Sequence, residues 1–178
     1  MFERFTAPAR TAVTIAAGNA RAAGTHEIDL DHLLAALLPA VPHTGLSPDA
    51  VNAVLHDLAE ARRRAGLSEV DARALAELGI DLDAIVAAAE RELGKGVLTA
   101  RARRSGGRLR LAPSARQALG AALRQARALG DRELRAEHLL LGVLAQRADR
   151  VPADVLAARG VTMATLIEAL DRGRRGVA

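Results

Sequence analysis

The chain has 178 residues and a net charge of +4, half of its residues are apolar, and it contains no cysteine. The lack of cysteine excludes a disulfide framework, a thiolate metal site and a cysteine nucleophile. No apolar run approaches the roughly 18–20 residues that a membrane-spanning helix needs, and the N-terminus lacks a signal-peptide profile, so we expect a soluble, cytoplasmic protein.

The core has to be built almost without aromatic side chains, because Phe2 and Phe5 are the only two in the chain. Alanine and leucine supply most of the apolar residues; both are strong helix formers, and β-branched runs are scarce. We therefore expect an all-α fold. The pI near 11.0 reflects basic residues that are nearly all arginine, with Lys95 as the one lysine. We interpret this bias as a compositional habit of the source genome and not as a signal for nucleic-acid binding.

Capping residues and apolar spacing divide the chain into helices. In the first half, the expected helices run from Thr6 to Gly24, from Asp29 to Pro42, from Ser47 to Gly66, from Ser68 to Leu78, and from Asp81 or Asp83 to Leu93. In the second half they span residues 113–129, 136–146, 153–159 and 162–170. The stretch 94–111 is rich in glycine and arginine and is expected to be a basic linker, and 172–178 a flexible tail.

Two stretches of the chain repeat each other in a constant register. Equivalent pairs are Arg10 and Arg116, Gly24 and Gly130, and His32 and His138, since 116 − 10, 130 − 24 and 138 − 32 all equal 106. In the later part of the unit the offset falls to 81 positions, as between Gly79 and Gly160. The first unit therefore holds 106 − 81, or 25, extra residues. We assign them to an inserted helix within about 42–70. The expected organisation is a first repeat over 1–93 and a second over 112–171, and a duplicated unit typically presents two related surfaces and not one catalytic centre.

The segments that open the two units follow a recognisable pattern. Phe2-Glu3-Arg4-Phe5-Thr6 precedes the first helix, Asp31-His32-Leu33-Leu34 follows the Gly24 turn, and the second unit carries Ala136-Glu137-His138-Leu139-Leu140-Leu141-Gly142-Val143-Leu144. On these segments the chain resembles the Clp N-terminal (Clp repeat) domain family, most closely its ClpC type. The resemblance implies a pseudo-twofold bundle of helices, here with an extra inserted helix in the first repeat.

The resemblance also implies a function. In that family the domain lies on the front of a ring-shaped AAA+ unfoldase and recruits substrates and adaptors for an associated protease. This sequence contains no G-x-x-x-x-G-K-[ST] phosphate loop, so it resembles a free-standing recognition domain without AAA+ modules. We expect a non-enzymatic binding module, without cofactor or metal, whose partners are Clp ATPase or protease components, substrate proteins or adaptors. Whether it delivers ligands as an adaptor or captures them as a decoy stays open.

Two acidic residues are candidates for ligand binding. In the ClpC branch the acidic residue before the histidine is implicated in binding phosphoarginine, and the matching positions are Asp31 and Glu137. A carboxylate can hold a guanidinium through a bidentate pair. The threonine that commonly precedes the acid is Leu30 in one unit and Ala136 in the other. The alternative is that both acids only favour the positive ends of their helices.

Phe2 is the candidate for an apolar contact. In actinobacterial ClpC relatives the matching phenylalanine helps to form a groove for cyclic peptides, and ordinary packing against the first helix is the alternative. His32 and His138 occupy equivalent positions without any recognised ligand spacing, so we expect structural, hydrogen-bonded histidines at helix junctions.

Two questions stay open at this stage. The rival function is a nucleic-acid-binding helical protein that uses the basic linker, which lacks interleaved aromatic residues for stacking. The apolar face of the inserted helix either packs on the first lobe, covers the binding groove of the repeat, or supplies a dimer contact.

Overall fold

The structure, a computed structural model, describes residues 4–64, 67, 69–94 and 109–175. Phe2, most of the expected linker and the end of the expected tail lie outside these ranges. Within them the chain forms an all-α double-repeat bundle with an extra helix in the first repeat, so the predicted fold class is confirmed. No helix in the described part is both long and apolar enough to cross a bilayer.

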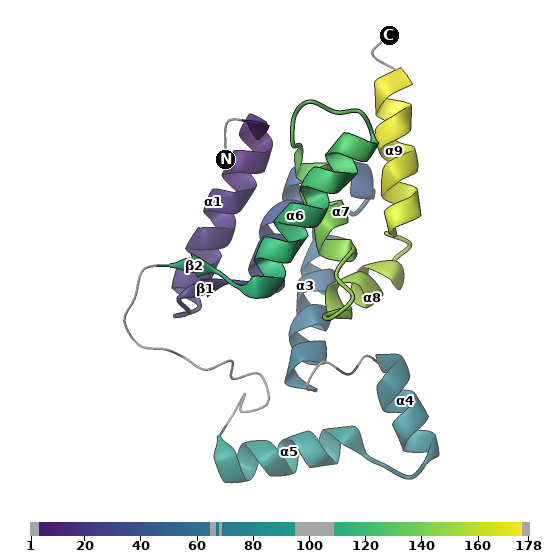
Figure 1. Ribbon diagram of the computed structural model, residues 1–178. Coiled ribbons are helices and arrows are strands. Elements are labelled where there is room, and N and C mark those ends of the chain that lie inside the picture. The colour runs from purple at the N-terminus through teal and green to yellow at the C-terminus, as the bar shows by residue number, and fades with distance from the viewer. Residues whose placement is uncertain (1–3, 65–66, 68, 95–108, 176–178) are drawn as a thin grey trace.

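The helices follow the predicted order (Figure 1), and the short strands β1 and β2 were not predicted. The first repeat contains α1 (Ala7–Ala22), β1 (Glu27–Ile28), α2 (Leu30–Leu37), the 3-10 turns η2 (Leu38–Ala40) and η3 (Pro42–Thr44), the inserted α3 (Pro48–Arg63), α4 (Glu69–Glu77) and α5 (Leu82–Leu93). The second contains β2 (Arg110–Leu111), α6 (Pro113–Ala128), α7 (Ala136–Leu144), α8 (Val151–Ala157) and α9 (Met163–Arg175). The last helix thus continues past residue 171, where the second repeat was expected to end.

Side-chain caps explain where several helices begin. Asp29 accepts hydrogen bonds from the backbone N–H groups of Asp31 and His32, and Ser47 caps α3, as predicted. Of the two candidates for α5, Asp81 and Asp83, Asp81 is the cap. Thr6 occupies the cap position of α1, but its side chain makes no capping bond. The helix after Asp29 ends at Leu37, earlier than expected, and continues as 3-10 turns towards Pro42.

The two repeats meet around an approximate two-fold axis. Helices α2 and α7 pack on each other, while α1 packs on α7 and α2 packs on α6, which is the reciprocal pattern that two-fold related units produce. The backbone repeats this symmetry. Ile28 pairs with Leu111 in the parallel β1–β2 ladder, and Phe5 pairs with Leu134 in an isolated parallel bridge, so each bridge is the 106-position counterpart of the other.

Small residues let the first two helices of each repeat approach closely. The buried face of α1 consists of Ala9, Ala12, Ala16 and Ala20, and that of α6 includes the equivalents Ala115, Ala118, Ala122 and Ala126. The approach is tightest at Gly142 in α7, where a Cβ atom would lie 2.2 Å from the Ala118 carbonyl oxygen. Side chains larger than hydrogen are therefore excluded at that position.

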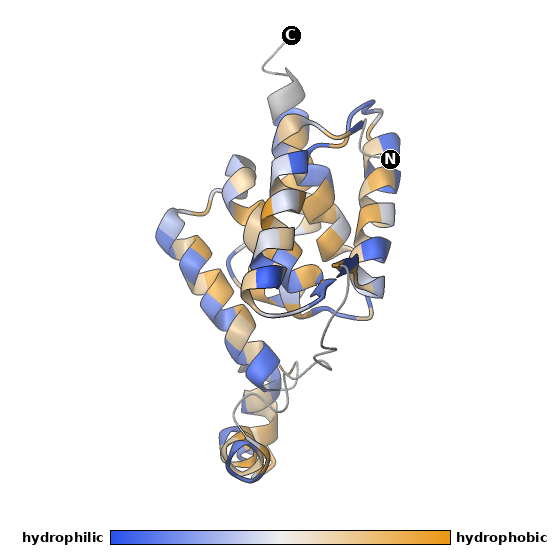
Figure 2. Cartoon of the chain, turned by 90° about the vertical axis from the view of Figure 1, so that its left-hand side faces the viewer, coloured by the Kyte–Doolittle hydropathy of each residue, from blue (hydrophilic) through white to orange (hydrophobic). Residues whose placement is uncertain are grey.

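The inserted helix and the segment after it depart from the symmetry. Helix α3 packs on α8 of the second repeat and on η2 of the first, and its buried residues are Val54, Leu58 and Ala61. Helices α4 and α5 pack on each other and lie beyond the end of α3, below the body of the bundle in both views (Figures 1 and 2). We call this pair the α4–α5 hairpin. Its equivalents, α8 and α9, pack instead on α7.

Candidate functional site

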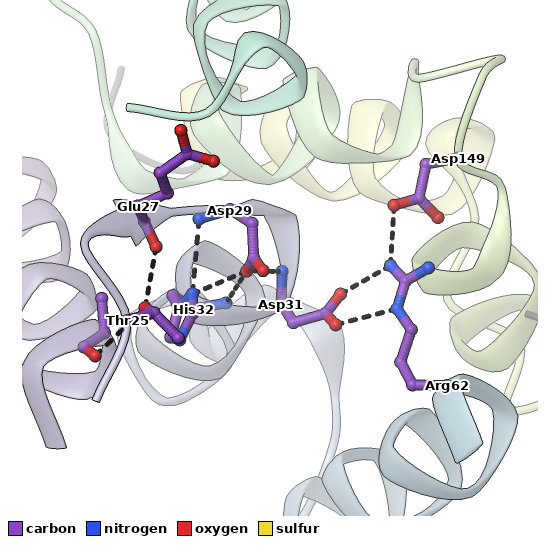
Figure 3. Close-up of polar contacts among 8 residues, drawn as sticks. Thr25, Glu27, Asp29, Asp31, His32, Arg62 and Asp149 are labelled. Atoms are coloured by element: carbon purple, nitrogen blue, oxygen red, sulfur yellow. Dashed lines mark hydrogen bonds and ion pairs between the residues drawn. The ribbon is translucent and has the colours of Figure 1, made fainter. Parts of the chain in front are cut away.

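A charged cluster joins α2, α3 and the loop that connects α7 to α8. Arg62, in the last turn of α3, donates through Nε to Asp31 Oδ2 at 2.8 Å and through Nη2 to Asp31 Oδ1 at 2.7 Å. The same Nη2 donates to Asp149 Oδ2 at 2.7 Å. Figure 3 shows the guanidinium between the two carboxylates. We call these three residues the Arg62 cluster; it connects the inserted helix to both repeats.

The electrostatics of the cluster favour the charged form of Arg62. Burial by itself lowers the pKa of this guanidinium, but hydrogen bonds and attraction from Asp31 and Asp149 outweigh burial, and the net pKa is raised. One cation faces two carboxylates, so the cluster carries a net negative charge when all three groups are ionised.

The sequence suggested Asp31 as an acid that binds a guanidinium. In the structure it binds the guanidinium of Arg62, from its own chain. The contact is bidentate, the geometry in which a carboxylate and a guanidinium match best. An external guanidinium that uses both oxygens of Asp31 must therefore displace Arg62.

The position of Asp31 is set by the cap that precedes it. Asp29 Oδ1 accepts from the backbone N–H groups of Asp31 and His32, at 3.0 and 3.1 Å, and the N–H of Asp29 donates in return to His32 Nδ1 at 3.3 Å (Figure 3). This reciprocal capping box fixes the first turn of α2 and the direction in which Asp31 leaves it.

The second repeat uses its histidine in the same way. The N–H of Arg135 donates to His138 Nδ1 at 3.1 Å, and His138 Nε2 lies 3.0 Å from Asp131 Oδ2. Burial is the main cause that lowers the pKa of His138, which is fully buried. Both histidines accept at Nδ1 from the cap residue, which agrees with the structural role expected for them. In the described residues no group of three or more His, Asp or Glu side chains could hold a metal ion.

The other predicted site residues fall elsewhere. Glu137 lies in the first turn of α7, half-buried, and so belongs to the central helix of the second repeat. Asp31 faces α3 through Arg62, whereas Glu137 is not part of that cluster. Phe2 lies outside the described residues, so its contacts stay a prediction.

A groove of about 700 Å³ lies beside the Arg62 cluster, between α1, α2 and α3. Its apolar walls come from all three helices, with Ile15 on α1, Ala35 on α2, and Leu55 and Leu58 on α3. Asp31, His32 and Arg62 line the same groove. The arrangement offers an apolar trough with a charged end, and it contains no nucleophile and base in catalytic contact.

Sequence reasoning missed Arg62 and Asp149. Arg62 follows Leu55, Leu58 and Ala59 at helical spacing, so it lies on the apolar face of α3 where a charged residue needs a partner. That spacing was the available signal. No local pattern indicated the partners, because Asp31 and Asp149 are 31 and 87 positions away in sequence.

The comparisons with known proteins identify the family. The model of the Clp repeat (R) N-terminal domain matches residues 65–159, which is more than half of the chain. The chain therefore belongs to the Clp repeat N-terminal domain family.

Solved structures of two such domains share the fold. The N-terminal domain of the caseinolytic protease associated chaperone ClpD from Arabidopsis thaliana superposes with a TM-score of 0.56 at 20% sequence identity, over 98% of this chain and 97% of that chain. The Hsp104 N-terminal domain from Candida albicans superposes with a TM-score of 0.51 at 20% identity, over 94% and 89%. Both likenesses concern the fold.

Proposed function

We propose that this chain is a non-enzymatic, cytoplasmic binding module of the ClpC type that recognises polypeptides for a Clp chaperone–protease system. The observation that carries the proposal is the groove between α1, α2 and α3, with apolar walls and the Arg62 cluster at its edge. Apolar grooves with a few placed charges are a common means of binding peptides. The fold and family agree with a binding role.

Phosphoarginine is the proposed ligand group for Asp31 and Glu137. The bidentate contact with Arg62 supports the capacity of Asp31 to hold a guanidinium. When a ligand displaces Arg62 from Asp31, the Arg62 side chain becomes a cation close to the incoming phosphate. Asp31 then holds the guanidinium part of the ligand, and Arg62 holds its phosphate part.

Calorimetry tests this ligand directly. Wild-type protein is expected to bind phosphoarginine more tightly than arginine, and the double variant Asp31→Ala, Glu137→Ala to give no binding heat. Asp49→Ala, which removes an exposed acid at the start of α3, is the matched control and should bind like wild type. Failure of the wild type to bind phosphoarginine contradicts this assignment.

Phe2 is proposed as the apolar contact for cyclic-peptide ligands. Titration of a cyclic peptide into wild type and Phe2→Ala, in parallel with phosphoarginine, separates the two contacts. We expect Phe2→Ala to weaken binding of the cyclic peptide and to leave phosphoarginine binding unchanged. Equal loss of both ligands would instead indicate a general loss of structure.

The direction of the effect on proteolysis distinguishes an adaptor from a decoy. A decoy acts by mass action, so added chain slows degradation of a model substrate by a Clp protease in proportion to the ligand that it captures. An adaptor speeds degradation of the substrates that it delivers. An unchanged degradation rate at saturating chain would contradict both mechanisms.

A further inference from the structure

Two apolar surfaces of the described chain are unusually exposed. Among its large hydrophobic side chains, the exposed ones are Leu78 at 77%, Leu93 at 70%, Ile85 at 53%, Ile15 at 46% and Ile80 at 40%. Four of them lie on the α4–α5 hairpin, which Figure 2 shows with orange as well as blue residues, and the fifth, Ile15, lines the groove. The hairpin and the groove thus both lack an apolar partner.

The repeat shows what α5 is built to do. With the 81-position register, Ile80 corresponds to Val161 and Ile85 to Leu166, and these counterparts are 2% and 1% exposed. Leu166 lies on α9, the equivalent of α5, which packs on α7, and Val161 lies just before that helix. The apolar pattern of α5 is therefore that of a helix that packs on a bundle.

The same comparison identifies the surface that α5 fits. With the 106-position register, Ile15 and Ala35 correspond to Ala121 and Leu141, which are 5% and 0% exposed. In the second repeat both positions are buried, and Leu141 belongs to the continuous core. In the first repeat they line the open groove. The groove therefore lies at positions of α1 and α2 whose equivalents in the second repeat are buried.

Within one molecule α5 is held away from this groove. Arg64, next to the end of α3, donates from Nε to Asp83 Oδ1 at 3.0 Å and from Nη2 to Asp83 Oδ2 at 3.3 Å, which ties the first turn of α5 to the end of α3. Arg63 Nη1 also lies 3.9 Å from Glu90 Oε2. In addition, α3 itself packs beside α8. The hairpin is thus presented outward with its apolar residues exposed.

We propose that α5 of a second copy of this chain fills the groove, and that the two copies exchange their hairpins reciprocally. Each chain carries one donor, the α4–α5 hairpin, and one acceptor, the groove. Reciprocal exchange therefore buries both surfaces of both chains in a closed two-fold dimer, with no apolar surface left to extend the assembly. The dimer goes beyond the binding function proposed above, and it competes with peptide ligands for the groove.

Sedimentation velocity without any ligand tests the dimer. Wild type is expected to dimerise as concentration rises. Ile85→Glu, which changes the donor, and Ile15→Glu, which changes the acceptor, should each raise the dissociation constant about tenfold or more. Both positions are exposed, so the fold is retained, as circular dichroism verifies. Ala164→Glu is the control, because it adds the same charge at an exposed position on the first turn of α9, outside both the donor and the acceptor. This position corresponds to Asp83 in the 81-position register, and the substitution should leave dimerisation unchanged.

Mixing the two variants gives the decisive result. Each variant alone forms only interfaces in which one partner is changed, but a mixture of Ile15→Glu and Ile85→Glu chains can form one fully native donor–acceptor pair. We expect the mixture to dimerise more tightly than either variant alone. A wild type that stays monomeric at all concentrations, a dimer insensitive to either substitution, or a mixture without gain overturns the proposal. Phosphoarginine binding is measured separately by calorimetry, so failure of the dimer and failure of the ligand assignment are distinguishable.

Discussion

Arg62 combines two roles at the scale of a single residue. Its guanidinium holds α3 against both repeats, and it occupies the acid that the binding proposal assigns to a ligand. A charged residue that is mostly buried and shares two carboxylates contributes to stability chiefly because its removal leaves those carboxylates without their common partner. A ligand for Asp31 must therefore supply a cation of its own.

Substitution of Arg62 by alanine should destabilise the fold. The change leaves Asp31 and Asp149 without this donor in a mostly buried place, and we expect a loss of about 2 kcal/mol in the free energy of unfolding. Arg63→Ala is the matched control, because Arg63 pairs with Glu60 on the more exposed side of the same turn and should cost at most about 0.5 kcal/mol. Urea denaturation followed by circular dichroism measures both. Equal losses would contradict the role of the cluster.

His138 should make stability depend on pH. Its folded pKa is lowered from the ordinary 6.5, mainly by burial, so just below pH 6.5 the unfolded chain binds more protons than the folded chain. The free energy of unfolding should therefore fall as pH decreases from about 6.5 towards the folded pKa, by at most about 1.4 kcal/mol per pH unit. Denaturation curves at several pH values check the slope.

A substitution assigns this slope to His138. In His138→Gln the dependence on pH in this window should become shallower, whatever the loss of stability at pH 7. His56→Gln, which changes an exposed side chain on α3, should leave the curve close to wild type. A slope that persists unchanged in His138→Gln would exclude this residue as its source.

At the scale of the elements, the contact between α6 and α7 depends on a missing side chain. Gly142→Ala adds a Cβ atom 2.2 Å from the Ala118 carbonyl oxygen and 2.9 Å from the Ala122 Cβ atom. The helices have to separate, so we expect a loss of about 2 kcal/mol or more, although alanine favours a helix over glycine by about 1 kcal/mol.

Gly18→Ala is a control with the opposite sign. Gly18 also lies inside a helix, α1, but a Cβ atom there would meet nothing within 4 Å. Only the gain in helix propensity remains, and we expect about 0.5–1 kcal/mol of stabilisation. The melting temperature and the urea midpoint should therefore fall in Gly142→Ala and rise in Gly18→Ala. A shift in the same direction would contradict the close approach at Gly142.

Local patterns in the sequence predicted where helices begin. They did not predict contacts between residues that are far apart in the chain. Asp29, Ser47 and Asp81 cap the helices that they were expected to cap, because a cap depends only on the next few residues. The repeat register correctly indicated two related units. The register did not indicate that the α4–α5 hairpin lies away from the bundle, because the apolar pattern of α5 is the same wherever that helix packs. The Arg62 cluster was missed for a similar reason, because its partners come from distant parts of the chain.

At the scale of the whole molecule, the α4–α5 hairpin and the core of the bundle should differ in stability. Val86 is the buried residue of α5, whereas in α7, the central helix of the second repeat, every residue except Glu137 is buried. In dilute solution, where the chain is monomeric, the amides of α5 should exchange with deuterium well before those of α7. Hydrogen-exchange mass spectrometry measures the difference. Equal protection of the two helices at low concentration would show that α5 is already packed.

The short β1–β2 ladder closes the chain on itself. Arg110 N–H donates to the His26 carbonyl and Ala112 N–H to the Ile28 carbonyl, both at 2.9 Å, so residues far apart in sequence are clasped together. The chain between Ile28 and Arg110 therefore begins and ends at this ladder. Extending the segment between α5 and β2 is thermodynamically inexpensive, since doubling the length of a flexible connection adds only about 0.6 kcal/mol of closure entropy. Foreign sequence grafted between α5 and β2 should therefore leave the second repeat folded.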